Sequence, residues 1–400
     1  MGERQKRIEV VRVWQLPQTF FSLDLDAQWH ALEAVTSPAV PLTEPRKPCP
    51  LSLADDCLAM GFFLVTLALP ISIALAAVPL ALGGCWPQLA WLGALVAVLA
   101  LHPMPRKSVW GRSNRLIIAL FRYFSFELLV DRNDPFQDGL MKLLGTRGAD
   151  TEAFQRRNLP AIYLACPHGV FNYGAIMWCC ISRWFTGWYQ ITGAAAAVTK
   201  VPGLRYMDLP IWMENPTRAN IKEEMQRADR ARRPAGSVRR PDAGEAGLSD
   251  RQRVGGMIGM VPDGILGAFR GRAGVDELVI GKKRGLMRIA AEEGATVWAA
   301  WFFGTTELLT VVQDPFRVME GLSRKLKAGI MGFYGRWGLP VPRRVPLSLV
   351  VAPTKVAKVE NPTKEQVDAV HDAVYLKGLC RVYEEQKAYA GYPNRTLVVS

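Results

Sequence analysis

Residues 161–169 read AIYLACPHG, a short apolar run that ends in a Pro-His-Gly turn. Six apolar residues followed by turn residues are typical of a buried β-strand. Two further apolar runs, 254–261 and 296–303, predict two more strands, and residues 282–293 predict a helix between them. Strands that alternate with helices indicate an α/β fold with a central sheet flanked by helices.

Three other helices are predicted around these strands. Residues 170–185 form an apolar run directly after the Pro-His-Gly turn. Residues 217–230 follow an amphipathic pattern that begins at Thr217, a residue type favoured as an N-cap. The last long helix is expected within residues 362–389. These elements predict a single α/β domain over residues 106–400.

The composition excludes several classes of protein. Half of the 400 residues are hydrophobic, which is enough for a sizeable core and excludes a mainly disordered chain. The chain has 49 Lys and Arg against 36 Asp and Glu, and its net charge of +13 favours phosphate-bearing partners. Seven irregularly spaced cysteines and four histidines suggest neither a disulfide framework nor a zinc site, so no metal is expected.

Residues 57–105 contain no Asp, Glu, Lys or Arg. As one helix, residues 58–101 would be about 66 Å long, roughly twice the thickness of a bilayer core. Two antiparallel helices are therefore expected, either as a transmembrane or as a re-entrant hairpin, with the turn at Gly83, Gly84 and Pro87. Basic residues flank the run on both sides, which predicts that both ends face the cytosol. A buried helical hairpin of a soluble protein is the alternative.

Two other segments differ from the apolar hairpin. Residues 1–56 are mostly polar and rich in proline, and we expect a loose cytosolic arm. Residues 227–253 carry eight arginines without an apolar period, which predicts a flexible insertion in the domain. No aromatic residue interleaves these arginines to stack on bases, so a nucleic-acid partner is not expected, and the insertion suits anionic lipid head groups better.

Two turns are the strongest candidates for chemistry. His168 follows a predicted strand, and ligands of α/β sheets bind at the carboxyl ends of the strands. Residues 261–269 read VPDGILGAF, in which another predicted strand ends in Pro-Asp-Gly and precedes a basic cluster. Backbone N–H groups of such a turn, together with nearby cations, suit phosphates. The alternatives are a structural histidine and a plain β-turn with a solvated basic face.

The ordered series of motifs resembles the type-2 diacylglycerol acyltransferase family, which includes monoacylglycerol acyltransferases and wax synthases. The family pattern Tyr-x-x-x-x-His-Pro-His-Gly is similar to residues 163–169 here. The resemblance covers roughly residues 57–395, and its later motifs are Lys283-Arg284-Gly285, Phe303-Gly304 with Glu307, Gly335-Arg336-Trp337-Gly338, and Asn361-Pro362-Thr363.

Two positions depart from the family pattern. Cys166 stands where the family has its first histidine. Gly267 stands where the family pattern Gly-Gly-x-x-Glu has its acid, and Asp263 lies four residues earlier. The Pro-Asp-Gly turn is more similar to the Pro-Glu-Gly turn of phospholipid acyltransferases. These departures leave the acyl acceptor open.

The resemblance implies an acyltransferase domain over residues 106–400 that transfers a fatty acyl group from acyl-CoA to diacylglycerol to make triacylglycerol. Acyl-CoA is then a co-substrate, and no bound cofactor is implied. His168 is implied as the general base, and Asp263 as the residue that orients His168 or places the acceptor. The implied substrate-binding residues, including cations for the CoA phosphates, are Pro167, Gly169, Gly264, Arg270, Arg272, Lys283, Arg284 and Gly285.

Three alternatives remain at this point. The acceptor could instead be a monoacylglycerol, a long-chain alcohol or phytol. Cys166 could take the acyl group covalently before passing it on. The chain could also be a non-catalytic lipid-droplet or membrane protein. The family implies the endoplasmic reticulum membrane, with lipid droplets as a second location and membrane lipids as partners, and leaves open whether the chain forms a homo-oligomer.

Overall fold

The computed structural model describes residues 7–102, 109–135, 137, 159–186, 188–195, 198–232, 254–280, 284–326 and 329–400. The Arg-rich insertion, apart from residues 227–232, lies outside the described residues. Lys283 lies outside them as well. The expectation for the insertion therefore stays a prediction.

A nine-stranded sheet lies at the centre of the molecule, in the order β2-β1-β3-β12-β9-β4-β7-β5-β6. The neighbours β9, β4, β7, β5 and β6 all run parallel, and β12 is antiparallel to β9. The strands are β1 (Ile8–Val11), β2 (Thr36–Pro38), β3 (Glu127–Asp131), β4 (Ala161–Cys166), β5 (Tyr189–Gly193), β6 (Met213–Glu214), β7 (Val254–Met260), β9 (Thr296–Phe303) and β12 (Ser348–Lys355).

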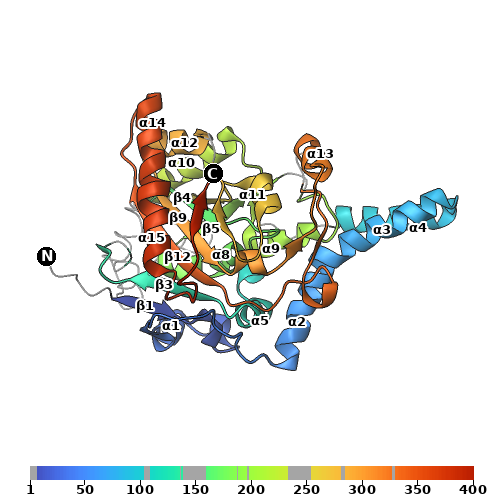
Figure 1. The fold of residues 1–400 in the computed structure, drawn as a ribbon, viewed down its shortest axis with the longest axis horizontal. Coiled ribbons are helices and arrows are strands. Elements are labelled where there is room, and N and C mark those ends of the chain that lie inside the picture. The colour runs from blue at the N-terminus through green and yellow to red at the C-terminus, as the bar shows by residue number, and fades with distance from the viewer. Residues whose placement is uncertain are drawn as a thin grey trace, which may run out of the picture.

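Helices cover both faces of this sheet (Figure 1). The helices are α1 (Leu25–Ala34), α2 (Leu53–Phe63), α3 (Leu69–Leu82), α4 (Trp86–Leu101), α5 (Arg115–Tyr123), α8 (Tyr173–Thr186), α9 (Asp208–Ile211), α10 (Arg218–Arg232), α11 (Gly264–Arg270), α12 (Gly285–Glu293), α13 (Val318–Leu326), α14 (Lys364–Asp372) and α15 (Cys380–Gln386). A π-helical turn, Ala373–Leu379, joins α14 to α15.

Side chains alternate along β4 between two hydrophobic cores. Tyr163 belongs to the core beneath α5 and α8, whereas Ile162 and Leu164 belong to the core beneath α10, α12, α14 and α15. This alternation is the period of two that a strand imposes on its side chains. A strand buried on both faces needs an apolar residue at nearly every position, as the sequence of β4 provides.

The predicted α/β fold is confirmed, with strands β4, β7 and β9 and helices α10 and α12 at the expected places. The helix expected from residue 170 begins later, at Tyr173. The Asn172 side chain accepts a hydrogen bond from Ala175 N (2.8 Å) and caps this helix.

The expectation of a loose amino-terminal arm is wrong. Strand β1 pairs with β3, β2 pairs with β1, and both extend the central sheet. Val13, Leu16 and Phe20 are buried beside them. The apolar residues of this segment are few and scattered, but they gain burial from β3 and α5, which are distant in the sequence.

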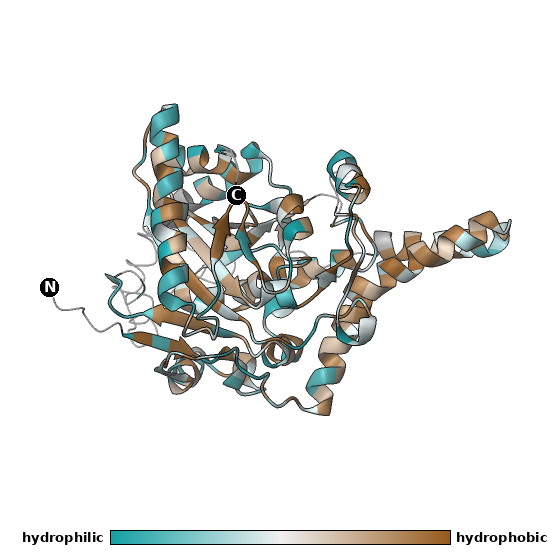
Figure 2. Ribbon diagram, in the orientation of Figure 1, coloured by the Kyte–Doolittle hydropathy of each residue, from teal (hydrophilic) through white to brown (hydrophobic). Residues whose placement is uncertain are grey.

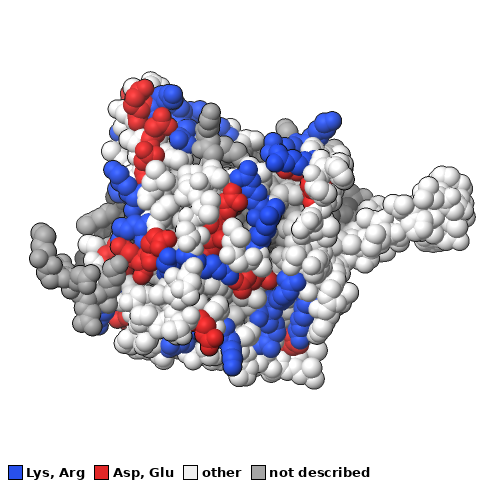
Figure 3. All heavy atoms as spheres, in the orientation of Figure 1, with Lys and Arg blue, Asp and Glu red and all other residues white. Residues whose placement is uncertain are grey.

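Helices α3 and α4 project from the body of the protein side by side (Figure 1). They are joined at Gly83 and Gly84, and Gly84 has a φ of +66°. None of the α3 side chains is buried, and the projecting helices are mostly apolar (Figure 2) and carry no charged side chain (Figure 3). The continuous helix Leu53–Leu82 is long and apolar enough to cross a membrane.

Polar contacts fix the base of the hairpin to the body at both of its ends. On α2, the buried Asp55 carboxylate binds Arg122 of α5 (2.9 Å). At the other end, the Arg205 guanidinium donates to the carbonyl oxygens of Leu99 (2.8 Å) and His102 (2.9 Å) at the end of α4. A cation at these carbonyl groups also complements the negative end of the helix dipole.

We expect Asp55→Ala to lower the free energy of unfolding by about 3 kcal/mol, because breaking a buried ion pair leaves a partly buried guanidinium without its counter-charge. Asp56→Ala is the matched control. Asp56 also pairs with an arginine, Arg336, but that pair is more exposed, and its loss should cost about 1 kcal/mol or less. Thermal unfolding in detergent measures both, and equal losses would contradict the anchoring role of Asp55.

Candidate active site

Three loops meet at the carboxyl edge of the parallel strands. Strand β4 lies between β7 and β9, and its loop carries His168, whereas the loops after β7 and β9 carry Asp263 and Thr305. A Cβ atom added to Gly169 would lie 3.0 Å from Thr305 Cγ2, so the loops after β4 and β9 are in contact. This edge is where the sequence predicted a ligand site.

The His168 ring is held by its own turn. Its Nδ1 lies 2.7 Å from the carbonyl oxygen of Gly169, and since a carbonyl only accepts, Nδ1 carries the proton in the neutral ring. Nε2 then has a free lone pair, and no group in the described part of the chain bonds to it. The side chain is half-buried. The turn thus presents a proton acceptor at the strand edge.

Asp263 connects the loop after β7 to this turn. Its Oδ2 accepts a hydrogen bond from the backbone N–H of His168 (2.8 Å), not from the ring. The side chain is 1% exposed, and its Oδ1 has no partner among the described residues. Burial raises the pKa of Asp263, opposed by His168 and by backbone N–H groups. The carboxylate therefore positions the histidine through its backbone.

The missing side chain of Gly267 makes room for Asp263. A Cβ atom at position 267 would lie 2.6 Å from Asp263 Cβ and closer still to its carboxylate. Real Cβ atoms do not approach other atoms so closely. The carboxyl group of Asp263 therefore occupies the space that a side chain at 267 would need, which explains in physical terms why the two departures from the family pattern occur together.

Helix α11 lies across the His168 turn. Gly264 begins the helix with a φ of +55°, and Gly169 on the facing turn has a φ of +56°. Gly271, just after α11, is so close that an added Cβ atom would lie 3.3 Å from Gly169 Cα. The predicted residues Gly169 and Gly264 thus belong to the same small region as His168 and Asp263.

Asn172 is a residue that the sequence analysis missed. Its Nδ2 donates to the carbonyl oxygen of Pro167 (2.9 Å), while its Oδ1 caps α8. The side chain therefore ties the Pro-His turn to the start of the following helix. An Asn just before an apolar helical run is a recognised N-cap signal, so the sequence did contain the clue.

Two of the basic residues expected to bind phosphates, Arg270 and Arg284, have carboxylate partners in the structure. Arg270, at the end of α11, pairs with Glu277 (2.7 Å), and Arg284 pairs with Asp368 of α14 (2.6 Å). Arg272 forms a backbone bridge with Val275. Gly285 is the first residue of α12. The structure thus places Arg270 and Arg284 on two separate ion pairs.

Cys166 is poorly suited to covalent catalysis. Its side chain is fully buried in the core on the α12 side of the sheet. Burial raises the pKa of the thiol well above its usual value, and the nearby Asp263 raises it further. A thiolate is the reactive form of cysteine, so this environment argues against the acyl-cysteine alternative. Within the described residues, no three His, Cys, Asp or Glu side chains are grouped as metal ligands.

Comparison with known proteins gives a consistent assignment. Residues 244–400 match the family described as diacylglycerol acyltransferase. A 2-acylglycerol O-acyltransferase 1 from Bos taurus is 32% identical over 134 residues, which is 30% of this chain and 39% of that protein. An acyl-CoA wax alcohol acyltransferase 1 from Homo sapiens is 26% identical over 149 residues, covering 34% of this chain and 45% of that protein.

A third relative is a diacylglycerol O-acyltransferase 2 from Xenopus laevis, 27% identical over 160 residues, which is 37% of this chain and 44% of that protein. The matched part thus spans less than half the length of each of these relatives. No solved structure matches the chain. The resemblance inferred from the motifs is confirmed at the level of the family.

We expect Gly267→Ala to lower the free energy of unfolding by about 1–3 kcal/mol, because the added methyl group overlaps the Asp263 side chain. In an Asp263→Gly background the same substitution should cost little, since the overlapping carboxylate is gone. This double-mutant cycle is read by thermal unfolding. Gly61→Ala is the control, because an added Cβ atom there meets nothing within 4 Å. Additive effects at 263 and 267 would contradict the shared space.

Proposed function

We propose that this chain transfers an acyl group from acyl-CoA to the hydroxyl of diacylglycerol, since residues 244–400 match the family described as diacylglycerol acyltransferase. The observation that carries this proposal is that Nδ1 of His168 is held by Gly169 at the carboxyl edge of β4, while none of the described residues bonds to Nε2. A neutral histidine in this state is suited to accept a hydroxyl proton near neutral pH.

In the proposed reaction, the acceptor hydroxyl attacks the thioester carbonyl while Nε2 takes its proton. A carbon–oxygen bond forms, and collapse of the tetrahedral intermediate breaks the carbon–sulfur bond. The proton then passes from Nε2 to the departing CoA sulfur, so His168 returns to its neutral state. Asp263 keeps the His168 backbone in place through its hydrogen bond and takes no proton from the acceptor in this scheme.

Backbone N–H groups of the two turns are candidates for stabilising the oxyanion. Both the turn at Gly169 and the turn at Gly264 lie beside His168 and supply such N–H groups. Arg270, Arg272, Lys283 and Arg284 remain the candidates for the CoA phosphates. For Arg270 and Arg284, phosphate binding would require exchange of an existing carboxylate partner.

The hairpin supports a location at a membrane, and we infer a re-entrant arrangement with both ends in the cytosol. Helix α3 has 14 residues, about 21 Å at 1.5 Å per residue, whereas the bilayer core is roughly 30 Å thick. The continuous helix Leu53–Leu82 is long enough to cross a membrane, but its first part, α2, is held on the body by the Asp55–Arg122 ion pair, so α3 and α4 are the parts that project. A hairpin that enters one leaflet suits the endoplasmic reticulum membrane and also the monolayer of a lipid droplet.

The acceptor is the part of the proposal that most needs a direct test. Relatives are named for 2-acylglycerol, wax alcohol and diacylglycerol substrates. Microsomes from cells that express the protein would receive labelled acyl-CoA and each acceptor in turn: diacylglycerol, monoacylglycerol, a long-chain alcohol and phytol. Labelled triacylglycerol as the main product is expected. A different main product would replace diacylglycerol, and no product at all would favour a non-catalytic membrane protein.

We expect His168→Ala to reduce turnover by about 10²–10⁴-fold, the usual contribution of a positioned general base. The protein level and membrane association should stay normal, because the half-buried side chain lies at the edge of the fold. Cys166→Ser should keep most of the activity, since the buried thiol has no role in the proposed reaction. The outcome contradicting this assignment is wild-type turnover in His168→Ala, or loss of activity in Cys166→Ser alone.

Two substitutions of Asp263 distinguish a positioning role of this residue from a role of its negative charge. Asp263→Asn keeps an oxygen that can accept from the His168 N–H, so we expect it to retain much more activity than Asp263→Ala. In Asp263→Ala the turn loses its bond to the loop after β7, and displacement by about 1 Å can cost about 100-fold in rate. Steady-state kinetics on both variants measures this. Equal loss in both would indicate that the charge itself is required.

A further inference from the structure

Two large apolar side chains stand out from the body of the protein into solvent. Phe316 is 87% exposed and precedes α13, and Trp337 is 66% exposed in a short turn, η8 (Arg336–Gly338). Both belong to one stretch of chain that follows the site loop after β9. Burial of such side chains is normally favourable, so their exposure calls for an explanation.

The backbone is strained at both positions. Arg317, next to Phe316, has a φ of +52°, and Trp337 itself has a φ of +59°. Side chains other than glycine rarely adopt this left-handed region, because Cβ comes too close to the backbone. Strain of this kind persists only where the surrounding structure imposes it, and it concentrates at functional positions. Here it holds two aromatic residues outward.

Helix α13 has a well-formed amino-terminal cap, although it exposes apolar side chains to solvent. The Asp314 carboxylate caps it by accepting from Val318 N (3.0 Å) and Glu320 N (2.9 Å). Val318 is 66% exposed and Leu322 44% exposed on the resulting helix. An amphipathic helix that exposes apolar side chains such as Val318 and Leu322 is typical of a segment that lies in a membrane interface.

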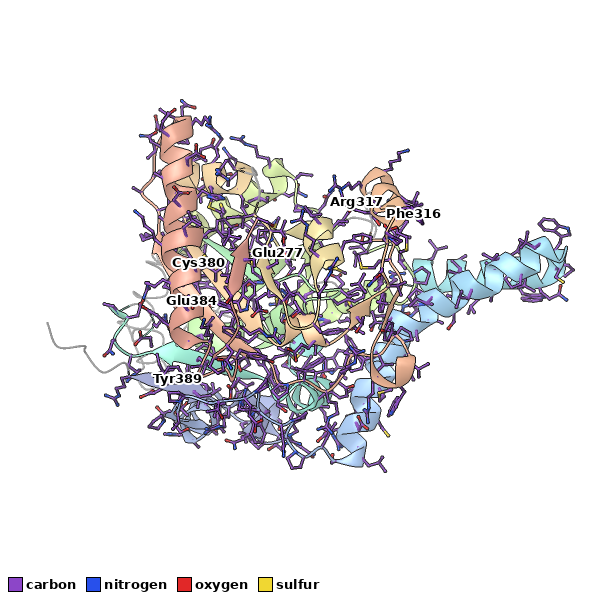
Figure 4. All side chains as sticks on the ribbon, viewed as in Figure 1. Glu277, Phe316, Arg317, Cys380, Glu384 and Tyr389 are labelled. Atoms are coloured by element: carbon purple, nitrogen blue, oxygen red, sulfur yellow. The ribbon has the colours of Figure 1, made fainter. Side chains whose placement is uncertain are left out.

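The charges around this helix fit an anionic surface. Arg317 and Lys325 are exposed and have no carboxylate partner in the described part of the chain, while Arg324 pairs with Glu320 (2.6 Å). Figure 4 shows Phe316 and Arg317 together at the start of α13, and Figure 3 shows basic side chains at this corner of the molecule. Two free cations beside exposed apolar residues match anionic head groups above acyl chains.

This surface lies on the same side of the molecule as the hairpin. Arg336 of η8 binds Asp56 of α2 (2.9 Å), which places Trp337 near the hairpin base. In Figure 1, α13 also lies toward the side from which α3 and α4 project. A membrane that takes up the hairpin would therefore come close to both aromatic residues.

We propose that Phe316, Val318 and Leu322 of α13, together with Trp337, form a second membrane contact that inserts into the head-group region of an anionic phospholipid leaflet. Aromatic residues favour this region of a bilayer, where their rings lie between head groups and acyl chains. The contact is a property of the surface and does not depend on the acyl-transfer chemistry at His168. A second copy of this chain on the same surface is the competing occupant.

The test uses the full chain in vesicles of phosphatidylcholine with phosphatidylserine, with a photoactivatable group on the lipid acyl chain near the head group. Mass spectrometry then identifies the labelled peptides. We expect label in peptides containing residues 316–322 and residue 337, in addition to the hairpin. Omitting phosphatidylserine should lower the label at 316–322 by about tenfold, because Arg317 and Lys325 then lose the anionic head groups that attract them. Label confined to the hairpin would overturn the proposal.

Substitutions test whether Phe316 and Trp337 themselves make the proposed membrane contact. Phe316→Ser with Trp337→Ser should reduce the label at 316–322 and 337 to background while the hairpin stays labelled. Leu376→Ser is the matched control, because Leu376 is 46% exposed on the helix between α14 and α15. It should change nothing. Unchanged label in the double variant overturns the proposal, and so does chemical cross-linking of Phe316 peptides to a second copy in place of lipid. Both outcomes are independent of acyl-transfer activity.

Discussion

The hydrogen bond from the His168 backbone to the Asp263 carboxylate is the contact on which the site depends. It joins the loops after β4 and β7, which are distant in the sequence, at the edge where the parallel strands end. Because the Asp263 side chain is buried, the hydrogen bond is shielded from competing water molecules. The carbonyl group of Gly169 orients the His168 ring, and Asn172 donates a hydrogen bond to the Pro167 carbonyl group in the same turn.

Several contacts connect the projecting hairpin to the body of the protein. Helix α2 continues into α3 through the π-helical turn Leu64–Ala68, and its other end is held by a buried ion pair. Arg205 fixes the end of α4, and Arg336 fixes the turn that carries Trp337. These contacts determine which face of the body meets the surface that the hairpin enters.

Local patterns in the sequence were sufficient for the central strands, because β4, β7 and β9 are apolar runs bounded by turn residues. They were not sufficient for β1, whose partner β3 lies more than a hundred residues away and gives a short strand its stability. The Asp368 partner of Arg284 is also distant, 84 residues along the chain, whereas Glu277 is only seven residues from Arg270 and was overlooked as its partner. By contrast, the spacing of four between 263 and 267 does place both residues on one side of a helical turn.

The shared space of positions 263 and 267 also constrains how such a site can change in evolution. The Asp263 carboxyl group fills the space that a Cβ atom at 267 would need, so an acid at 263 disfavours any side chain at 267. The least costly route by single substitutions from an acid at 267 to an acid at 263 therefore passes through a chain with glycine at both positions and no acid on this turn. Packing thus couples the two positions, and selection acts on the pair.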